Sequence, residues 1–240
     1  VGDTILLQSA ATNMGVANYN LGAWFQASRD WREALVLAEK LGSAYAIALA
    51  RSNQGLLLMR RGALDQSGSY LRQAVRWSGR CGDQWLFSHV CSNLGELEWR
   101  LGDVDSALAL YDRAEQIMRW NGLVDDLPEL LRRRAEVLLN LNLLTDASEQ
   151  LVVAEQLAED SGNRLETEVI RMVRARMLRA ESKHREAWTT ASRCSSELAE
   201  LSAEYEFARS VQLLGELMAE ADENDSEGAM ANLKRARRIF

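Results

Sequence analysis

The side chains that could do catalytic or metal chemistry are few and scattered in this sequence of 240 residues. The two histidines, His89 and His184, lie far apart in the chain, and the cysteines Cys81, Cys91 and Cys194 have no spacing typical of a metal site. No glycine-rich loop of the phosphate-binding type occurs. We therefore predict no catalytic residue, no metal site and no cofactor, and we interpret the cysteines as buried thiols in a reducing compartment.

The chain is acidic as a whole, with a formal net charge of −7. This balance argues against direct binding of nucleic acid. One short stretch concentrates carboxylates, namely Glu96, Glu98, Asp103 and Asp105. At these spacings the four side chains spread around a helix and the turn that follows it, so we interpret them as solvated surface.

Polar side chains of another kind recur at a fixed interval of 40 residues. The asparagines Asn13, Asn53 and Asn93 share one phase of this interval. Two places after this phase, every interval has a small residue: Gly15, Gly55, Gly95, Ala135, Ala175 and Gly215. The middle of every interval has a residue typical of turns: Gly22, Gly62, Gly102, Asn142, Ser182 and Asp222. A fixed period of this length is the signature of an array of repeated helix pairs.

We predict six repeats, near residues 2–41, 42–81, 82–121, 122–161, 162–201 and 202–240, which form one all-α domain over residues 1–240. A single proline and a hydrophobic share of 47% agree with a helical protein that buries a sizeable apolar surface. No run of 18 apolar residues predicts a membrane span. Because the chain opens without methionine and stops inside a helical pattern, we interpret it as part of a longer polypeptide. We expect this polypeptide to be cytoplasmic.

The recurrent small residues have a physical reason. Two antiparallel helices approach closely only where one of them carries Gly, Ala or Ser at the contact. Large residues one turn away then fill the space between neighbouring repeats, and we predict that Trp31, Leu71, Tyr111 and Leu151 are buried there.

The third repeat carries a family resemblance. Asn93, Leu94 and Gly95, followed by Gly102, Asp103, Ala107, Tyr111 and Ala114, are similar to the tetratricopeptide repeat pattern. The 40-residue length resembles the repeats of kinesin light chains and Pins-type adaptors, and the repeat regions of bacterial signal-transduction ATPases and regulators. The resemblance implies an all-α, right-handed superhelical solenoid of about six helix pairs.

In this family the first helix of each repeat lines a concave groove, where the asparagine often binds the backbone of an extended peptide. The resemblance therefore implies a row of partner-binding amides at Asn13, Asn53 and Asn93. The row lapses at Arg133, Val173 and Leu213.

Large apolar residues and arginines lie six and seven places beyond the asparagines. We predict a groove formed by Asn13, Tyr19, Asn53, Met59, Arg60, Asn93, Trp99, Arg100, Arg132 and Arg133, which suits a protein or peptide with acidic and apolar side chains. Structural alternatives stay open: the row of Tyr19, Met59 and Trp99 fits inter-helix core, the arginines fit solvated faces, and the asparagines fit bonds to neighbouring helices.

Three classes of function agree with these features. The first is a protein- or peptide-binding scaffold or sensor module of a larger signalling or regulatory protein. The second is a small-ligand sensor in a bacterial transcriptional regulator or ATPase. The third is a structural arm that self-associates. None of them is an enzyme, and none requires a membrane.

Overall fold

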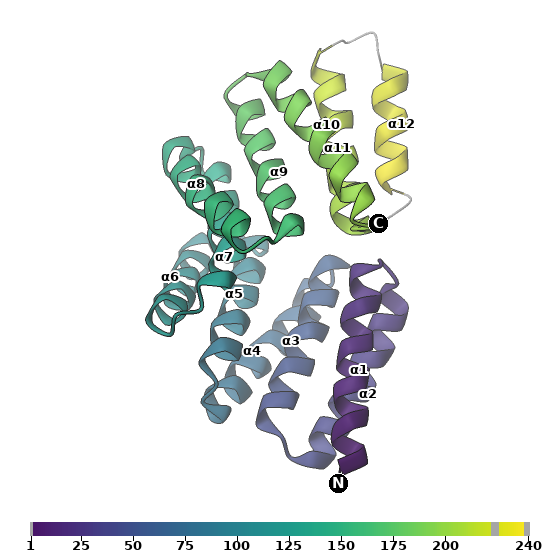
Figure 1. Ribbon diagram of the computed structural model, residues 1–240, viewed down its shortest axis with the longest axis vertical. Helices are drawn as coiled ribbons and strands as arrows, with labels where there is room; N and C mark the ends of the chain where they lie inside the picture. The colour runs from purple at the N-terminus through teal and green to yellow at the C-terminus, as the bar shows by residue number, and fades with distance from the viewer. Residues whose placement is uncertain (1, 222–225, 238–240) are drawn as a thin grey trace. The chain divides into compact units, whose positions relative to one another are not determined.

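The computed structural model describes residues 2–221 and 226–237. All regular structure in these residues is helical, and the predicted all-α class of about six helix pairs is confirmed (Figure 1). The helices are α1 (Gly2–Asn20), α2 (Trp24–Leu41), α3 (Ala44–Arg60), α4 (Leu64–Cys81), α5 (Gln84–Arg100), α6 (Val104–Trp120), the short 3-10 helix η1 (Val124–Asp126), α7 (Leu127–Asn140), α8 (Leu144–Asp160), α9 (Arg164–Ala180), α10 (His184–Glu200), α11 (Glu204–Ala221) and α12 (Ser226–Arg237).

Left-handed backbone recurs every 20 residues and ends the helices. Positive φ angles between 54° and 89° occur at Gly22, Gly42, Gly62, Gly82, Gly102, Gly122, Asn142, Gly162, Ser182 and Ser202. At Gly62 the turn closes through Gly62 N–H to Met59 O at 3.1 Å and Ala63 N–H to Leu58 O at 2.9 Å, which caps the last carbonyls of α3. The predicted mid-repeat turns are confirmed, except that Asp222 lies outside the described residues.

Within each of the first three helix pairs, a glycine of the first helix meets a large side chain of the second. A Cβ atom added to Gly15 would lie 2.3 Å from the Trp31 ring, and one added to Gly55 would lie 2.6 Å from Leu71. At Gly95 the corresponding distance to Tyr111 is 2.8 Å. Any side chain at these positions would push the paired helices apart.

The predicted space-filling residues Trp31, Leu71, Tyr111 and Leu151 are all at most 1% exposed, as expected. The cysteines are free thiols, with Cys91 and Cys194 buried and Cys81 partly buried. Burial raises the pKa of the Cys91 thiol to about 11 and, together with Glu168, that of Cys194 to about 12. Both thiols are therefore protonated and unreactive at neutral pH.

The chain divides into two compact units, which are described separately. The N-terminal unit comprises Val1–Tyr19 and Ala23–Asp126, and the C-terminal unit comprises Asn20–Gly22 and Leu127–Phe240. Within each unit the second helix of one pair packs on the first helix of the next. Ala74 of α4, for example, packs against Leu86 and Val90 of α5, and Ala187 and Ala191 of α10 pack against Leu213 and Leu217 of α11.

Among the described residues, no helix combines the length and the apolar character that crossing a bilayer requires.

Truncation of a buried aromatic residue tests the packing of the helix pairs. Because Tyr111 is fully buried against Gly95, Tyr111→Ala should lower the free energy of unfolding by roughly 3–5 kcal/mol. Trp120 ends the same helix and is 91% exposed, so Trp120→Ala should cost no more than about 0.5 kcal/mol. Chemical denaturation of both variants measures the difference. Equal losses would show that the helical phase is misassigned.

Candidate functional site

The first helices of successive pairs lie next to each other and share polar contacts. In the N-terminal unit these are α3 and α5, where Asn93 Nδ2 donates to Ser52 Oγ at 3.1 Å and Arg60 Nη1 donates to Glu96 Oε1 at 3.2 Å. In the C-terminal unit they are α7, α9 and α11. We call the surface formed by these helices in each unit its first-helix face.

The three asparagines of the predicted row differ in their surroundings. Asn93 is tied to Ser52, so it fulfils the structural alternative of a bond to the neighbouring helix. Asn13 is exposed on α1. Asn53 is partly buried, and its Nδ2 is buried without an acceptor among the residues that the structure describes.

The neighbouring helix α1 has a threonine where α3 has the serine that Asn93 contacts. The residue 40 places before Ser52 is Thr12. Its hydroxyl donates to Gln8 O at 3.0 Å and accepts from Gln8 Nε2 at 2.9 Å. This hydroxyl bonds within α1, and the amide nitrogen of Asn53 is a buried donor without an acceptor among the described residues.

One member of the predicted row of large apolar residues, Met59, does not lie on the first-helix face. Met59 is fully buried in the core with Leu71, Leu94 and Leu97, so its assignment to the groove is wrong. Six residues turn an α-helix about 120° short of two full turns, which carries Met59 from the side of Asn53 to the core. Tyr19 is half-buried, with its ring 5.6 Å from that of Trp31. Trp99 is also half-buried.

Glu96 organises the arginines of the N-terminal unit. Arg60 Nη1 lies 3.2 Å from Glu96 Oε1, and Arg100 Nη2 lies 2.9 Å from the same oxygen. Arg60 Nε also donates to Tyr19 Oη at 3.1 Å. Glu96 is only 4% exposed, so its interpretation as solvated surface is wrong. Arg60 and Arg100 are thus engaged with a buried carboxylate of the fold.

Arg132 and Arg133 of α7 are buried as well, 6% and 5% exposed, which corrects the prediction that they line an open groove. Arg132 Nε donates to Glu166 Oε1 at 2.6 Å, and Arg133 Nη2 donates to Glu129 Oε1 at 2.6 Å. Burial alone lowers the pKa of Arg132, but Glu166, Glu136 and Glu129 raise it well above its ordinary value. Burial raises the pKa of Glu166 to about 7, against the opposing charge of Arg132.

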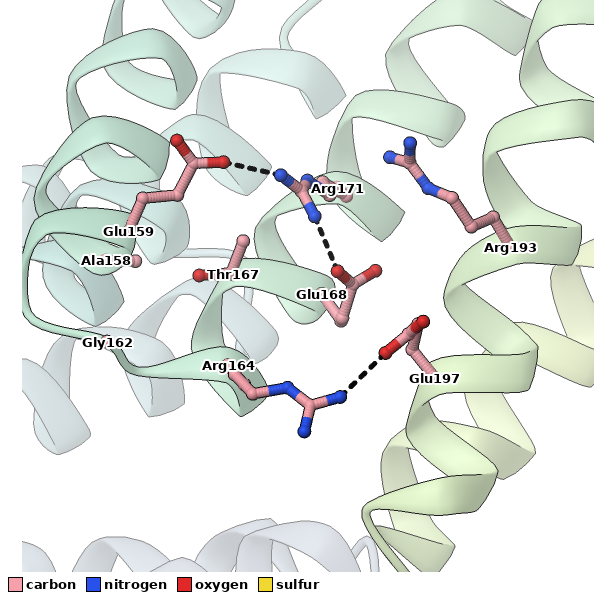
Figure 2. Close-up of a pocket in the computed structure, with 9 residues that line it drawn as sticks. All are labelled: Ala158, Glu159, Gly162, Arg164, Thr167, Glu168, Arg171, Arg193 and Glu197. Carbon is pink, nitrogen blue, oxygen red and sulfur yellow. Dashed lines mark hydrogen bonds and ion pairs between the residues drawn. The ribbon is translucent and has the colours of Figure 1, made fainter.

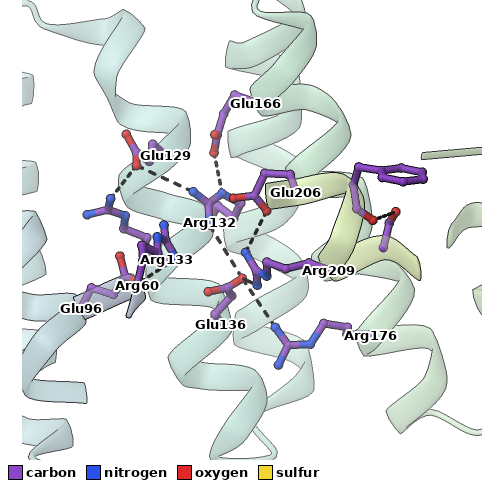
Figure 3. Close-up of polar contacts among 12 residues, drawn as sticks. Arg60, Glu96, Glu129, Arg132, Arg133, Glu136, Glu166, Arg176, Glu206 and Arg209 are labelled. Atoms are coloured by element: carbon purple, nitrogen blue, oxygen red, sulfur yellow. Dashed lines mark hydrogen bonds and ion pairs between the residues drawn. The ribbon is translucent and has the colours of Figure 1, made fainter. Parts of the chain in front are cut away.

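Glu136 of α7 is shared by three arginines from three first helices. Its Oε1 lies 3.7 Å from Arg132 Nη1, 3.6 Å from Arg176 Nη1 of α9 and 3.1 Å from Arg209 Nη2 of α11 (Figure 3). The pair of Glu136 and Arg209 therefore links α7 with α11 although α9 stands between them in chain order.

Arg176 is the least compensated cation of this cluster. Arg132 also forms an ion pair with Glu166, and Arg209 also forms one with Glu206 at 3.0 Å. Arg176 makes no hydrogen bond with any residue that the structure describes, and 32% of its side chain stays accessible. Burial lowers its pKa, with Arg209 and Arg179 acting in the same direction against Glu136 and Glu216.

The guanidinium of Arg176 borders a cavity of about 250 Å³ between α9 and α11. The lining residues are Met172, Arg176, Arg179, Arg209, Gln212, Leu213 and Glu216. Arg179 is engaged by Glu216 and Glu220, and Gln212 Nε2 donates to Glu216 Oε1 at 2.9 Å. The donors of Arg176 are thus available to an anionic group in the cavity.

A second cavity of about 370 Å³ lies between α8, α9 and α10 of the same unit (Figure 2). Its charged groups are largely matched with each other: Arg171 binds Glu168 at 2.6 Å and Glu159 at 2.5 Å, and Arg164 binds Glu197 at 3.0 Å. Arg193 is exposed at its border. This matching makes it a weaker candidate for ligand binding than the cavity beside Arg176.

Sequence reasoning missed Glu136, Arg176 and Arg209. A signal was present, because one phase of the 40-residue period holds four charged residues, of which only the third is positive: Glu96, Glu136, Arg176 and Glu216. This phase lies three residues beyond that of Asn53, hence on the same side of the first helix. Within the described part of the chain, no group of three His, Cys, Asp or Glu side chains is arranged to hold a metal ion.

Comparison with known proteins places the fold. Neither a family model nor a curated protein sequence matches the chain. Among solved structures, BtubC (BKLC) from P. vanneervenii is similar with a TM-score of 0.61 and 17% identity, over 92% of this chain and 90% of that one. A Rap protein complexed with competence and sporulation factor is similar with a TM-score of 0.82 and 11% identity, over 99% of this chain and 64% of that one.

A third similar structure is the Rap conjugation gene regulator of the plasmid pLS20 in complex with the Phr* peptide. Its TM-score is 0.77 with 15% identity, over 97% of this chain and 64% of that one. The chain thus spans less than two thirds of the length of either Rap protein. With its paired helices, it has the fold of tetratricopeptide-type helical repeat proteins, as the sequence resemblance predicted.

Removal of the shared carboxylate tests the charge cluster. Glu136→Gln leaves Arg132, Arg176 and Arg209 close together without their common anion, so the free energy of unfolding should fall by roughly 3 kcal/mol. Glu149 on α8 is exposed, and Glu149→Gln should change it by no more than about 0.5 kcal/mol. If denaturation curves of the two variants coincide, Glu136 does not hold the first helices together.

Proposed function

We propose that this chain is a peptide-binding sensor or scaffold module of a larger signalling or regulatory protein, and that it binds its partner through the first-helix faces. The observation that carries the proposal is a pair of donors that make no hydrogen bond with any described residue. One is Asn53 Nδ2 in the N-terminal unit, and the other is the guanidinium of Arg176 in the C-terminal unit.

The amide of Asn53 suits a peptide backbone. A buried donor without an acceptor costs about 1–3 kcal/mol, which is recovered when an acceptor arrives. Every residue of an extended peptide offers a backbone carbonyl, so this contact holds a peptide irrespective of its sequence.

The guanidinium of Arg176 suits a carboxylate. Its planar donors match a carboxylate oxygen pair, and such charge-assisted bonds give orientation as well as affinity. The cavity beside it also carries the apolar side chains of Met172 and Leu213. An acidic side chain flanked by an apolar one fits this lining, which supports a partner with acidic and apolar residues.

The similar folds lend support of a general kind. One Rap structure contains competence and sporulation factor and another contains the Phr* peptide, so this architecture accommodates such partners in those proteins.

A small-ligand sensor is the second candidate, and the cavity of about 250 Å³ favours it. A small anion would use Arg176 but not Asn53, whereas a peptide partner of the N-terminal unit requires Asn53. Substitution of Arg176 should therefore weaken binding of a small anion, whereas substitution of Asn53 should weaken binding of a peptide. In a purely structural arm, neither substitution should change the binding of a ligand.

Selection of linear peptides from a random phage-displayed library against the full chain provides the probe. For a selected peptide, Asn53→Ala should weaken binding about five-fold, the value of one hydrogen bond near 1 kcal/mol, as measured by calorimetry. Gln66 is an exposed amide on α4 of the same unit, and Gln66→Ala should leave the affinity unchanged. A library that yields no binder, or equal affinities for both variants, would argue against peptide binding by this face.

Substitution of Arg176 tests the choice of acidic partners. Arg176→Gln should weaken binding of an acidic peptide about tenfold or more, as expected for a bond between charged groups. The same peptide with its acidic residues amidated should bind both proteins equally, and added salt should weaken only the acidic form. Arg185 is an exposed arginine on α10, and Arg185→Gln serves as the matched control. A loss of equal size with the amidated peptide would contradict the role of Arg176.

A further inference from the structure

The cavity of about 370 Å³ between α8, α9 and α10 coincides with a departure of α9 from the repeat pattern. Thr167 of α9 lines this cavity. At its phase of the 40-residue period, the other first helices carry large apolar side chains: Leu7, Ile47, Phe87, Leu127 and Phe207. A threonine fills much less space than these residues, which leaves room between the three helices.

The residue next to Thr167 departs from the pattern as well. At the phase of Glu168, the other first helices have uncharged residues that are buried: Gln8, Ala48, Ser88, Pro128 and Ala208. Glu168 is buried too, and a buried carboxylate is costly unless it is paired and hydrogen-bonded. The packing of the repeats therefore does not account for a charge at this position.

The carboxylate of Glu168 is only half engaged. Its Oε1 accepts from Arg171 Nη1 at 2.6 Å. Its Oε2 is buried and has no hydrogen-bond partner among the residues that the structure describes. The neighbouring Cys194 thiol, whose pKa Glu168 helps to raise, is a weak donor at most. A cationic donor in the cavity would satisfy this oxygen much better.

Arg193 of α10 supplies the opposite charge at the border of the cavity. Two repeats earlier, the corresponding arginine, Arg113, lies over the ring of Phe87, 4.7 Å from its centroid. Thr167 takes the place of this ring beside Arg193. Arg193 is exposed and makes no hydrogen bond or ion pair with any described residue, and its side chain extends from α10 toward the α9 side of the cavity (Figure 2). Its guanidinium is therefore open to an anion.

The charges of the lining balance. Three arginines face three glutamates: Arg164, Arg171 and Arg193, and Glu159, Glu168 and Glu197. A ligand with a net charge would upset this balance in a partly buried site. A ligand that carries one positive and one negative group keeps the balance and meets both open groups, Glu168 Oε2 and the guanidinium of Arg193.

We propose that this cavity binds a small zwitterion of the amino-acid class, with its ammonium group on Glu168 and its carboxylate on Arg193. The three donors of a primary ammonium suit a carboxylate oxygen, and the planar guanidinium matches the carboxylate of the ligand. The volume lies within the range of about 300–1,000 Å³ that is typical of small-molecule sites. The cavity is separate from the groups assigned to peptide binding, so this inference goes beyond the proposed function and is independent of it.

Calorimetric titration of the full chain with the natural amino acids, β-alanine and γ-aminobutyrate is the direct probe. We expect saturable binding of at least one of them, and the preferred length reports the separation of the two charges. The N-acetylated form of the best ligand lacks the cation, and its carboxamide lacks the anion. Each should bind at least about tenfold more weakly, as expected for the loss of a bond between charged groups. These analogues test Glu168 without altering the protein.

Two variants locate the ligand in this cavity. Arg193→Gln should weaken binding about tenfold or more, whereas Arg185→Gln, at an exposed site on the same helix, should leave it unchanged. Thr167→Phe restores the residue type of α5 and α11 at this phase and should exclude the ligand. Arg193→Gln alters only an exposed side chain, so it keeps the test valid if Thr167→Phe perturbs the packing.

Three results would overturn the proposal. The first is that no zwitterion binds. The second is that the zwitterion and its N-acetylated form bind equally. The third is that binding survives Arg193→Gln but is lost with Arg176→Gln, which would assign the ligand to the other cavity.

Discussion

The close contact between one small residue on a first helix and one large residue on its second helix is the constraint on which the structure depends. At Gly15 and Trp31, Gly55 and Leu71, and Gly95 and Tyr111, no side chain fits between the backbone and the large neighbour. This contact fixes the rotation of the first helix about its own axis. Residues two places before each glycine are thereby turned away from the partner helix, where they form the first-helix face.

The first-helix face carries charge because it is not needed for packing within the pair, yet neighbouring first helices bury much of it. Buried charges are tolerated only with partners, so Glu96 and Glu136 each serve more than one arginine. Such sharing leaves some groups under-compensated. Among the described residues, Arg176 has an ion pair at 3.6 Å and no hydrogen bond, and Asn53 Nδ2 is one of several buried polar atoms without a hydrogen-bond partner. The proposed function assigns both groups to the partner.

The fold was largely predictable from sequence because its determinants are local and periodic. Left-handed turns follow from Gly22, Gly62 and Gly102 at one phase, and even Asn142 and Ser182 adopt the same backbone. The candidate site was not predictable from sequence, because its ion pairs join residues that are 34 to 73 positions apart. Examples are Arg132 with Glu166 and Arg209 with Glu136. The misplacement of Met59 has a simpler cause: a shift of one residue moves a side chain by about 100° around the helix, from the surface to the core.

The most direct test of the account is the side-chain amide resonance of Asn53 in a ¹⁵N-labelled sample, followed by NMR during titration with a selected peptide. A new acceptor should move the Asn53 NH₂ signals strongly, whereas those of Asn93, already bonded to Ser52, should move little. Shifts confined to the second helices, with the Asn53 signals unchanged at saturation, would contradict the claim that the first-helix face binds the partner.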